Sequence, residues 1–335
     1  MNIKKMVVGS VVGALMLGIM VIPALADSFG IDFETYTLGN INGQDGWSKT
    51  GPYDVAVVTN TYGFPSFGTQ TLRLSNAVTS GSFGDQTFSK SLVDEAGETD
   101  AQTSAYSGGS RQNHFEAQFD VASTMPTHQP GLFTSISPDR GDGARMGYVG
   151  LEDMSDGIHV IFYDYQDIAP FGTLATPADG CGDGDDWVLA ELTTLDRSTT
   201  HTIKITMDFV DGSRNDVVKV YVDGLLMHTG TSWEDYFRWC TESGGGVPND
   251  ASADVSRTVD SLLFRVGGAA APATSGFGYL FDNLTLSSTT LTSPTNKEAC
   301  KNDGWMAFNN PTFKNQGDCV SYVQSNENAV ANKTK

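Results

Sequence analysis

The stretch HTIKITMDFVDGSRNDVVKVYVDGLLMHTG, residues 201–230, has the most regular pattern in the chain. From Thr202 to Phe209 apolar residues alternate with polar ones, and this period of two places the apolar side chains on one face of a β-strand. A second alternating run, 217–222, ends at Asp223-Gly224, a dipeptide typical of two-residue hairpin turns. The stretch therefore predicts three consecutive antiparallel strands.

The chain on either side repeats this pattern in shorter segments. His114–Val121 (HFEAQFDV) alternates in the same way, and the segments around it are separated by clusters of Gly, Pro, Ser and Asn. No long segment of the sequence has the 3.6-residue period of a packed helix. These features predict an all-β, antiparallel β-sandwich and not a fold of alternating strands and helices.

Two resemblances extend this prediction. The run Val-Tyr-Val-Asp-Gly at 220–224 resembles a hairpin of the concanavalin-like and laminin-G-like β-sandwiches. Over residues 30–287 the chain also resembles a family of secreted bacterial proteins that has no assigned function, through segments 137–164, 229–236 and 259–265. The resemblances imply a jelly-roll β-sandwich, and they imply no catalytic residue.

The amino-terminal segment has the composition of a secretory signal. Met1–Ala26 begins with Lys4 and Lys5, continues as an apolar run and ends in Ala-Leu-Ala. This pattern predicts a signal peptide cleaved near Ala26, which would deliver the mature chain to the extracellular space or the periplasm. No second apolar run follows, so no membrane insertion of the mature chain is expected.

The predicted organisation has three parts after the signal. The β-sandwich is expected over residues 27–286, followed by a linker at 287–296 (SSTTLTSPTN), whose composition is that of a flexible connector. Residues 297–335 then form a short carboxyl-terminal segment bracketed by two cysteines, and a similar segment ends many secreted bacterial proteins. A short helix is expected at 316–324, with its apolar residues turned toward Trp305.

Four cysteines in a secreted chain can form two disulfides in three pairings. Cys300 and Cys319 enclose the tail, which leaves Cys181 to pair with Cys240 within the main domain. The alternative is a disordered tail whose cysteines pair with those of the main domain. The sequence has no Cys-x-x-Cys, so neither a zinc site nor redox chemistry through sulfur is expected.

Composition also limits the partners. The chain has 40 acidic and 20 basic residues, a formal net charge of −20, which disfavours nucleic acid and anionic membranes. An extracellular glycan or cell-surface polymer is the expected partner.

A metal site is suggested by the two ends of the predicted sandwich. Asp32-Phe33-Glu34 near the start and Asp282-Asn283 near the end resemble the paired terminal strands of bacterial carbohydrate-binding jelly rolls, in which such acids often hold a structural calcium. The resemblance assigns Glu34 and Asp282 as calcium ligands. The alternative is that both are solvated acids at strand edges.

Candidate glycan-binding residues lie on a predicted hairpin that turns at 153–157. If its apolar residues face the core, the other face carries polar and aromatic side chains, and Tyr165 and Arg145 lie just beyond it. Aromatic rings stack on the apolar faces of sugars while polar groups hold the hydroxyls. The alternative is the ordinary preference of Tyr for strands. The predicted ligand-binding set is Tyr148, Glu152, His159, Tyr163, Tyr165 and Arg145.

Catalysis has weaker support in the sequence. The Glu-x-Asp-x-x-Glu strand of glycosidases on this fold is absent, and Glu116 and Asp120 lie about 13 Å apart on one strand, too far for a retaining pair. Arg145, His159 and Tyr163 supply the residue types of a polysaccharide lyase without its motifs. A non-catalytic carbohydrate- or surface-binding protein is therefore predicted. A polysaccharide-degrading enzyme and a structural or adhesive protein without a sugar site remain the alternatives.

Overall fold

The computed structural model describes most of the chain. It covers residues 27–79, 84–99, 101, 109–143, 145–165, 187–212, 215–234, 236, 257–267, 270–272 and 276–333, the last eight through their backbone alone. Of the sequence predictions, the signal peptide at 1–26 and the pairing of Cys181 with Cys240 fall outside these residues.

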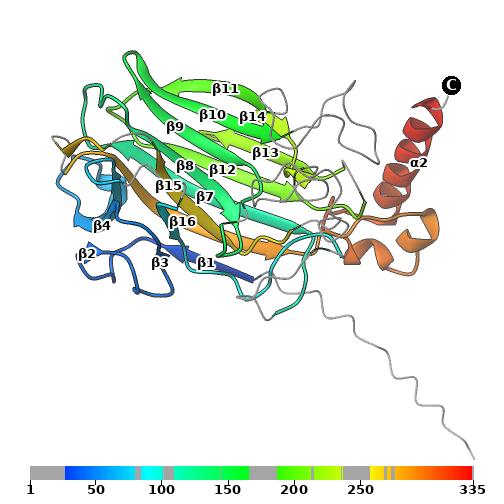
Figure 1. Ribbon diagram of the computed structural model, residues 1–335. Helices are drawn as coiled ribbons and strands as arrows, with labels where there is room; N and C mark the ends of the chain where they lie inside the picture. Colours follow the sequence, from blue (N-terminus) through cyan, green and yellow to red (C-terminus); the bar gives the residue numbers. More distant parts are fainter. Residues whose placement is uncertain are drawn as a thin grey trace, which may run out of the picture.

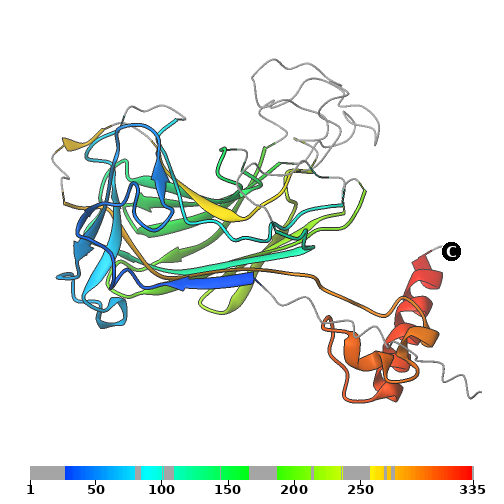
Figure 2. The same cartoon turned by 90° about the horizontal axis from the view of Figure 1, so that it is seen from below.

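The described chain is a sandwich of two antiparallel sheets, seen as two layers in Figures 1 and 2. One sheet has nine strands in the order β14-β13-β12-β7-β16-β5-β4-β2, with β1 pairing to β16 outside this path. It consists of β1 (Asp27–Ile31), β2 (Gly39–Asn40), β4 (Asp54–Thr59), β5 (Gln70–Ser75), β7 (His114–Ser123), β12 (His201–Asp208), β13 (Val217–Val222), β14 (Leu225–Gly230) and β16 (Tyr279–Thr289).

The other sheet has seven strands in the order β11-β10-β9-β8-β15-β6-β3. It consists of β3 (Ser48–Lys49), β6 (Gln86–Phe88), β8 (Phe133–Asp139), β9 (Tyr148–Met154), β10 (Gly157–Tyr165), β11 (Trp187–Leu195) and β15 (Ser261–Gly267). A single 3-10 turn, η1 (Pro65–Phe67), lies between β4 and β5. The predicted all-β jelly-roll sandwich is confirmed, with nearly half of the chain in strands.

The three strands predicted from residues 201–230 are β12, β13 and β14. β12 pairs with β13 in the register Ile203 to Val222, and its other edge pairs with β7. The turn residues Asp223 and Gly224 have φ angles of 50° and 79°, the left-handed region that the Asp-Gly dipeptide tolerates. The apolar side of each alternating run is buried, which is why the sequence specifies this meander so clearly.

The core lies between the inner faces of the two sheets. Phe264 of β15 packs against Phe281 of β16 and Trp47, with ring centroids 5.3 and 5.8 Å apart. Phe119 of β7 contacts Phe281 at 5.7 Å. All four rings are at most 2% exposed, so strands from both halves of the chain share one hydrophobic core.

The carboxyl-terminal segment follows β16 directly (Figure 2). β16 continues to Thr289, three residues past the predicted end of the sandwich, and Leu291 exchanges hydrogen bonds with the side chain of Asn113. The predicted linker is thus partly strand and is bonded to the sandwich at Leu291.

The tail itself folds around the Cys300–Cys319 disulfide, which confirms that pairing and rules out pairing of these two cysteines with the main domain. Its elements are η3 (Lys297–Cys300), η4 (Gly304–Ala307) and α2 (Gln316–Lys333), so the predicted helix is longer than expected. A small cluster surrounds the bridge: Cys300, Cys319 and Val323 are buried against Trp305, Phe308, Phe313, Val320 and Tyr322. In the described part of the chain, no helix combines the length and apolar character needed to cross a membrane.

Candidate functional site

The hairpin of β9 and β10 forms part of the outer face of the seven-stranded sheet, next to the edge strand β11. Its register places Tyr148 opposite Tyr163 and Glu152 opposite His159. Because side chains alternate along a strand, these four point away from the core. Their neighbours on the inner face, Val149, Leu151, Ile158, Val160 and Phe162, are fully buried, as the sequence predicted.

An aromatic row crosses this outer face. The rings of Tyr148 and Tyr163 stack with centroids 4.3 Å apart and an interplanar angle of 21°. Trp233 meets Tyr148 edge-on at 5.6 Å, and Phe133 meets Tyr163 edge-on at 6.1 Å. We call Phe133, Tyr163, Tyr148 and Trp233 the aromatic row. The two tyrosines cover one another's faces, so neither offers a free stacking surface on that side.

Phe133 is placed differently from the other three rings. It lies at the start of β8, directly opposite Gly267 of β15 and close to Gly150 of β9. A Cβ on Gly150 would lie 2.8 Å from ring carbons of Phe133 and Tyr163, and one on Gly267 would lie 2.7 Å from a ring carbon of Phe133. The Phe133 ring therefore occupies the space over both glycines, lying on the sheet, while the Tyr163 ring is turned 75° from it.

The Phe133 ring therefore forms a partly exposed aromatic surface, and the Tyr163 ring stands at a steep angle beside it. Phe133 is partly exposed, and Glu152 is its direct neighbour on β9. Such a corner can stack on the apolar face of a sugar while the carboxylate accepts hydrogen bonds from hydroxyls. The sequence analysis missed Phe133, and the only signal for it was the presence of glycines at the strand positions beside it.

Two arginine side chains, Arg145 and Arg265, lie close enough to Tyr148 to affect its pKa. Arg265 of β15 is opposite Ser135 of β8 on the outer face, and the guanidinium of Arg145 lies 5.8 Å from the Trp233 ring centroid. Burial raises the pKa of Tyr148, as does Tyr163, while Arg145 and Arg265 partly offset this by favouring the phenolate. Arg145 is buried at 7% exposure and Arg265 is partly exposed.

His159 is held at the opposite end of the hairpin, away from the arginines. Its Nε2 lies 2.9 Å from Oδ1 of Asp156 and its Nδ1 lies 2.7 Å from Oε1 of Glu191. The hydrogen bond to Asp156 raises the pKa of His159. His159 and Tyr163 are four residues apart on one strand, about 13 Å, so the two do not meet at one reacting atom as a lyase base and acid would.

Tyr165 does not belong to the surface set, contrary to the sequence prediction. It is 2% exposed and packs edge-on against Trp187 and Tyr236, both at 5.2 Å. Its face of the sheet is covered at this end of β10 by aromatic side chains, a tertiary contact that strand periodicity does not reveal. Of the predicted set, Tyr148 and Tyr163 lie together with Arg145 near them, and Glu152 lies beside His159.

The predicted calcium residues lie where β1 and β16 end their pairing. Asp282 is 1% exposed, and its Oδ1 accepts a hydrogen bond from the Asn283 backbone N–H at 2.7 Å, whereas Oδ2 has no hydrogen-bond partner. Burial raises the pKa of Asp282 to about 8, with smaller contributions from the charges of Asp32 and Glu34. A buried carboxylate oxygen without a donor is suited to a cation.

Glu34 is already engaged by the protein. Its Oε1 accepts hydrogen bonds from the backbone N–H groups of Thr69 and Gln70 at 2.6 and 3.0 Å, and its pKa is lowered chiefly by the hydroxyl of Thr69. The backbone is left-handed at Phe33 and Asn283, with φ angles of 58° and 48°, a strained form for Phe.

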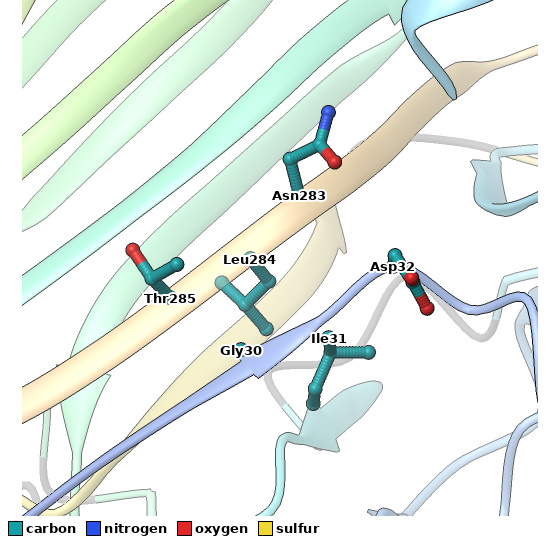
Figure 3. A pocket seen from close by; sticks show the side chains of 6 residues that line it. All are labelled: Gly30, Ile31, Asp32, Asn283, Leu284 and Thr285. Atoms are coloured by element: carbon teal, nitrogen blue, oxygen red, sulfur yellow. The ribbon is translucent and has the colours of Figure 1, made fainter. Parts of the chain in front are cut away.

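Beside these residues is a pocket of about 290 Å³ between β1 and β16, shown in Figure 3. Asp32 and Asn283 lie toward the same end of it. Its lining residues are Gly30, Ile31, Asp32, Asn283, Leu284 and Thr285.

A second acidic cluster was not predicted. Glu98, Asp216 and Glu234 are buried, with carboxylate oxygens within 4.8 Å of one another, so this group could bind a metal. Burial raises the pKa of Asp216 to about 7, while its oxygens accept hydrogen bonds from the Val210 N–H and the Ser232 hydroxyl. The three acids come from three separate segments, so no local motif in the sequence indicates them.

Comparisons with known proteins bear on the architecture alone. No protein-family model and no curated protein matches the chain. Similar solved structures include a sialidase (12% identity, TM-score 0.40), covering 82% of this chain, and this chain spans only 19% of the sialidase. Others are an alginate lyase in complex with an alginate trisaccharide (15%, TM-score 0.42; 80% of this chain and 99% of that chain) and a β-glucanase from Bacillus licheniformis (16%, TM-score 0.35; 78% and 98%). No residue role is transferred from them.

Proposed function

We propose that this protein is a secreted, non-catalytic carbohydrate-binding β-sandwich whose glycan lies on the outer face of the seven-stranded sheet. The observation that carries the proposal is the Phe133 ring lying over Gly150 and Gly267, next to Tyr163. Glycine at both positions leaves an aromatic ring partly exposed on a sheet, where a polar side chain would suit solvent better.

Enzymatic alternatives find less support in the described residues. Asp120 and Glu116, on the outer face of the other sheet, are bonded to Thr202 and Lys204 at 2.6 and 3.4 Å. His159 and Tyr163 are too far apart to act on one sugar carbon. Binding without turnover needs none of these groups.

We also propose a structural calcium held by Asp282 and Glu34. The unpartnered Oδ2 of the buried Asp282 supports it, as do the charges of Asp32 and Glu34 that help to raise the pKa of Asp282, because a divalent cation would offset this negative charge. Such an ion would stabilise the junction between β1 and β16, and it has no catalytic part.

A glycan array with the purified protein tests the binding proposal. Phe133→Ala should weaken binding to any retained glycan at least about tenfold, since the variant loses the stacking surface. Tyr221→Ala is the matched control, because Tyr221 is a partly exposed aromatic on the outer face of the nine-stranded sheet. Parallel assays for reducing sugar and unsaturated uronate should be negative.

An array with no retained glycan, or equal losses in the two variants, would overturn the proposal. Product formation in either assay would replace it with an enzymatic function. Thermal melts of both variants check that the sandwich is intact.

A further inference from the structure

The charges around the aromatic row are not evenly distributed. Arg145 and Arg265 both lie close enough to Tyr148 to affect its pKa, whereas Glu152 lies opposite Phe133 and Glu191 lies beside His159. Both arginines also have partners within the protein. What bears on a ligand is therefore only the positive charge of each guanidinium and its position on the face.

Arg265 is the more accessible of the two. It lies on the outer face between Ser135 and Gln86 of the neighbouring strands, and it is partly exposed. Burial lowers its pKa, which the charges of Tyr148 and Asp85 partly offset. Asp85 is fully buried, so a ligand on this face meets the guanidinium and not the acid.

We propose that the glycan is acidic, and that the carboxylate of a uronate residue binds at Arg265, which lies on the same outer face as Tyr148, two strands away. This inference rests on the proposed glycan-binding function of the same face. The Arg265 guanidinium supplies charged donors, and the Tyr148 phenol on the same face supplies a neutral one, a combination that a sugar carboxylate can accept.

The position of Glu152 sets the direction of the bound chain. A second carboxylate is disfavoured beside Glu152, and sugar hydroxyls are favoured there because they can donate to it. The acidic group of the ligand therefore lies toward Arg265, and a sugar ring lies over Phe133. Because the overall charge of −20 repels a polyanion, an acidic glycan needs local positive charge where it binds, and Arg145 and Arg265 supply it on this face.

A matched ligand pair tests the inference: a uronate oligosaccharide and its carboxyl-reduced counterpart, titrated calorimetrically into the full secreted protein. The uronate form should bind about tenfold more tightly, in line with one charge-assisted contact. Arg265→Gln should remove most of this difference, and Arg265→Lys should keep part of it. Lys219→Gln removes one positive charge from the outer face of the other sheet and should leave the difference unchanged.

The outcomes distinguish failure of the acidic-glycan inference from failure of the proposed glycan-binding function. If both ligands bind equally, or if Arg265→Gln weakens both to the same extent, the acidic-glycan inference is wrong while glycan binding stands. If neither ligand binds and Phe133→Ala changes nothing on the array, the proposed function fails, and the inference fails with it.

Discussion

The outer faces of the two sheets carry different kinds of side chains. On the nine-stranded sheet, Lys204 pairs with Glu116 at 3.4 Å and His114 pairs with Asp208 at 2.6 Å, between neighbouring strands. On the seven-stranded sheet the aromatic row crosses the outer face over small residues such as Gly150. Both outer faces carry charged side chains, but only that of the seven-stranded sheet also carries the aromatic row.

The difference indicates where function is to be sought. Solvent-exposed ion pairs across strands contribute about 1 kcal/mol or less each, and they need nothing beyond solubility to explain them. Partly exposed rings held by glycines have no such explanation, since a charged surface would serve solubility better. The contrast thus supports placing the proposed glycan site on the seven-stranded sheet.

The largest effect expected from this contrast is on stability. Tyr148→Ala should lower the free energy of unfolding by about 3 kcal/mol, because the ring packs between Tyr163 and Trp233. Lys204→Ala, on the other sheet, should cost about 0.5 kcal/mol or less. Urea unfolding with unchanged m-values measures both, and similar losses for the two variants would erase the contrast.

Calcium should raise the thermal stability of the protein through the site on the nine-stranded sheet, without a contribution from the aromatic row. At a free concentration one hundred times the dissociation constant, calcium would add about 2.7 kcal/mol, a shift of several degrees in Tm. Asp282→Asn should remove the shift, and Asp208→Asn, an equal charge change on the outer face of the same sheet, should not. Melts that are identical with calcium and with chelator would contradict the site.

If Asp282→Asn retains the shift and Asp216→Asn loses it, the metal binds the second acidic cluster instead.

The smallest effect concerns the glycines. Gly150→Ala should cost about 1–2 kcal/mol and weaken glycan binding, since the added Cβ displaces the Phe133 and Tyr163 rings. Gly30→Ala should lie within about 0.5 kcal/mol of the native protein, because its Cβ would have ordinary contacts of 3.7 and 3.9 Å. Chemical unfolding together with titration of the array ligand checks both, and no loss of binding in Gly150→Ala would mean that Phe133 does not define the site.

The fold was largely predictable because apolar and polar residues alternate within most of its longer strands. The 201–230 meander and the β9–β10 hairpin each bury one apolar set, which fixes their register and faces. The Cys300–Cys319 bridge was predicted because the two cysteines bracket a compositionally distinct tail. The full length of α2 was not predicted, because its apolar residues are only weakly concentrated on one face of the helix.

The site was predictable only in part, because it is assembled across strands. Tyr148 and Tyr163 come from one hairpin, so their pairing followed from strand alternation. Phe133 and Gly267 are brought together by β8–β15 pairing, a contact between distant segments that no local pattern encodes. Tyr165 was misplaced for the same reason, since Tyr236 covers it from another part of the chain.

The route by which the tail leaves the sandwich has a mechanical consequence. β16 runs through the nine-stranded sheet, paired with β7 over much of its length and with β1 from Leu284 to Ser288, and it continues into the disulfide-closed tail. A pulling force applied at the tail would act along β16 and load the hydrogen bonds to β7 and β1 together, in shear. A protein held by this end would resist a pulling force through many hydrogen bonds at once, and the outer face of the seven-stranded sheet would remain accessible.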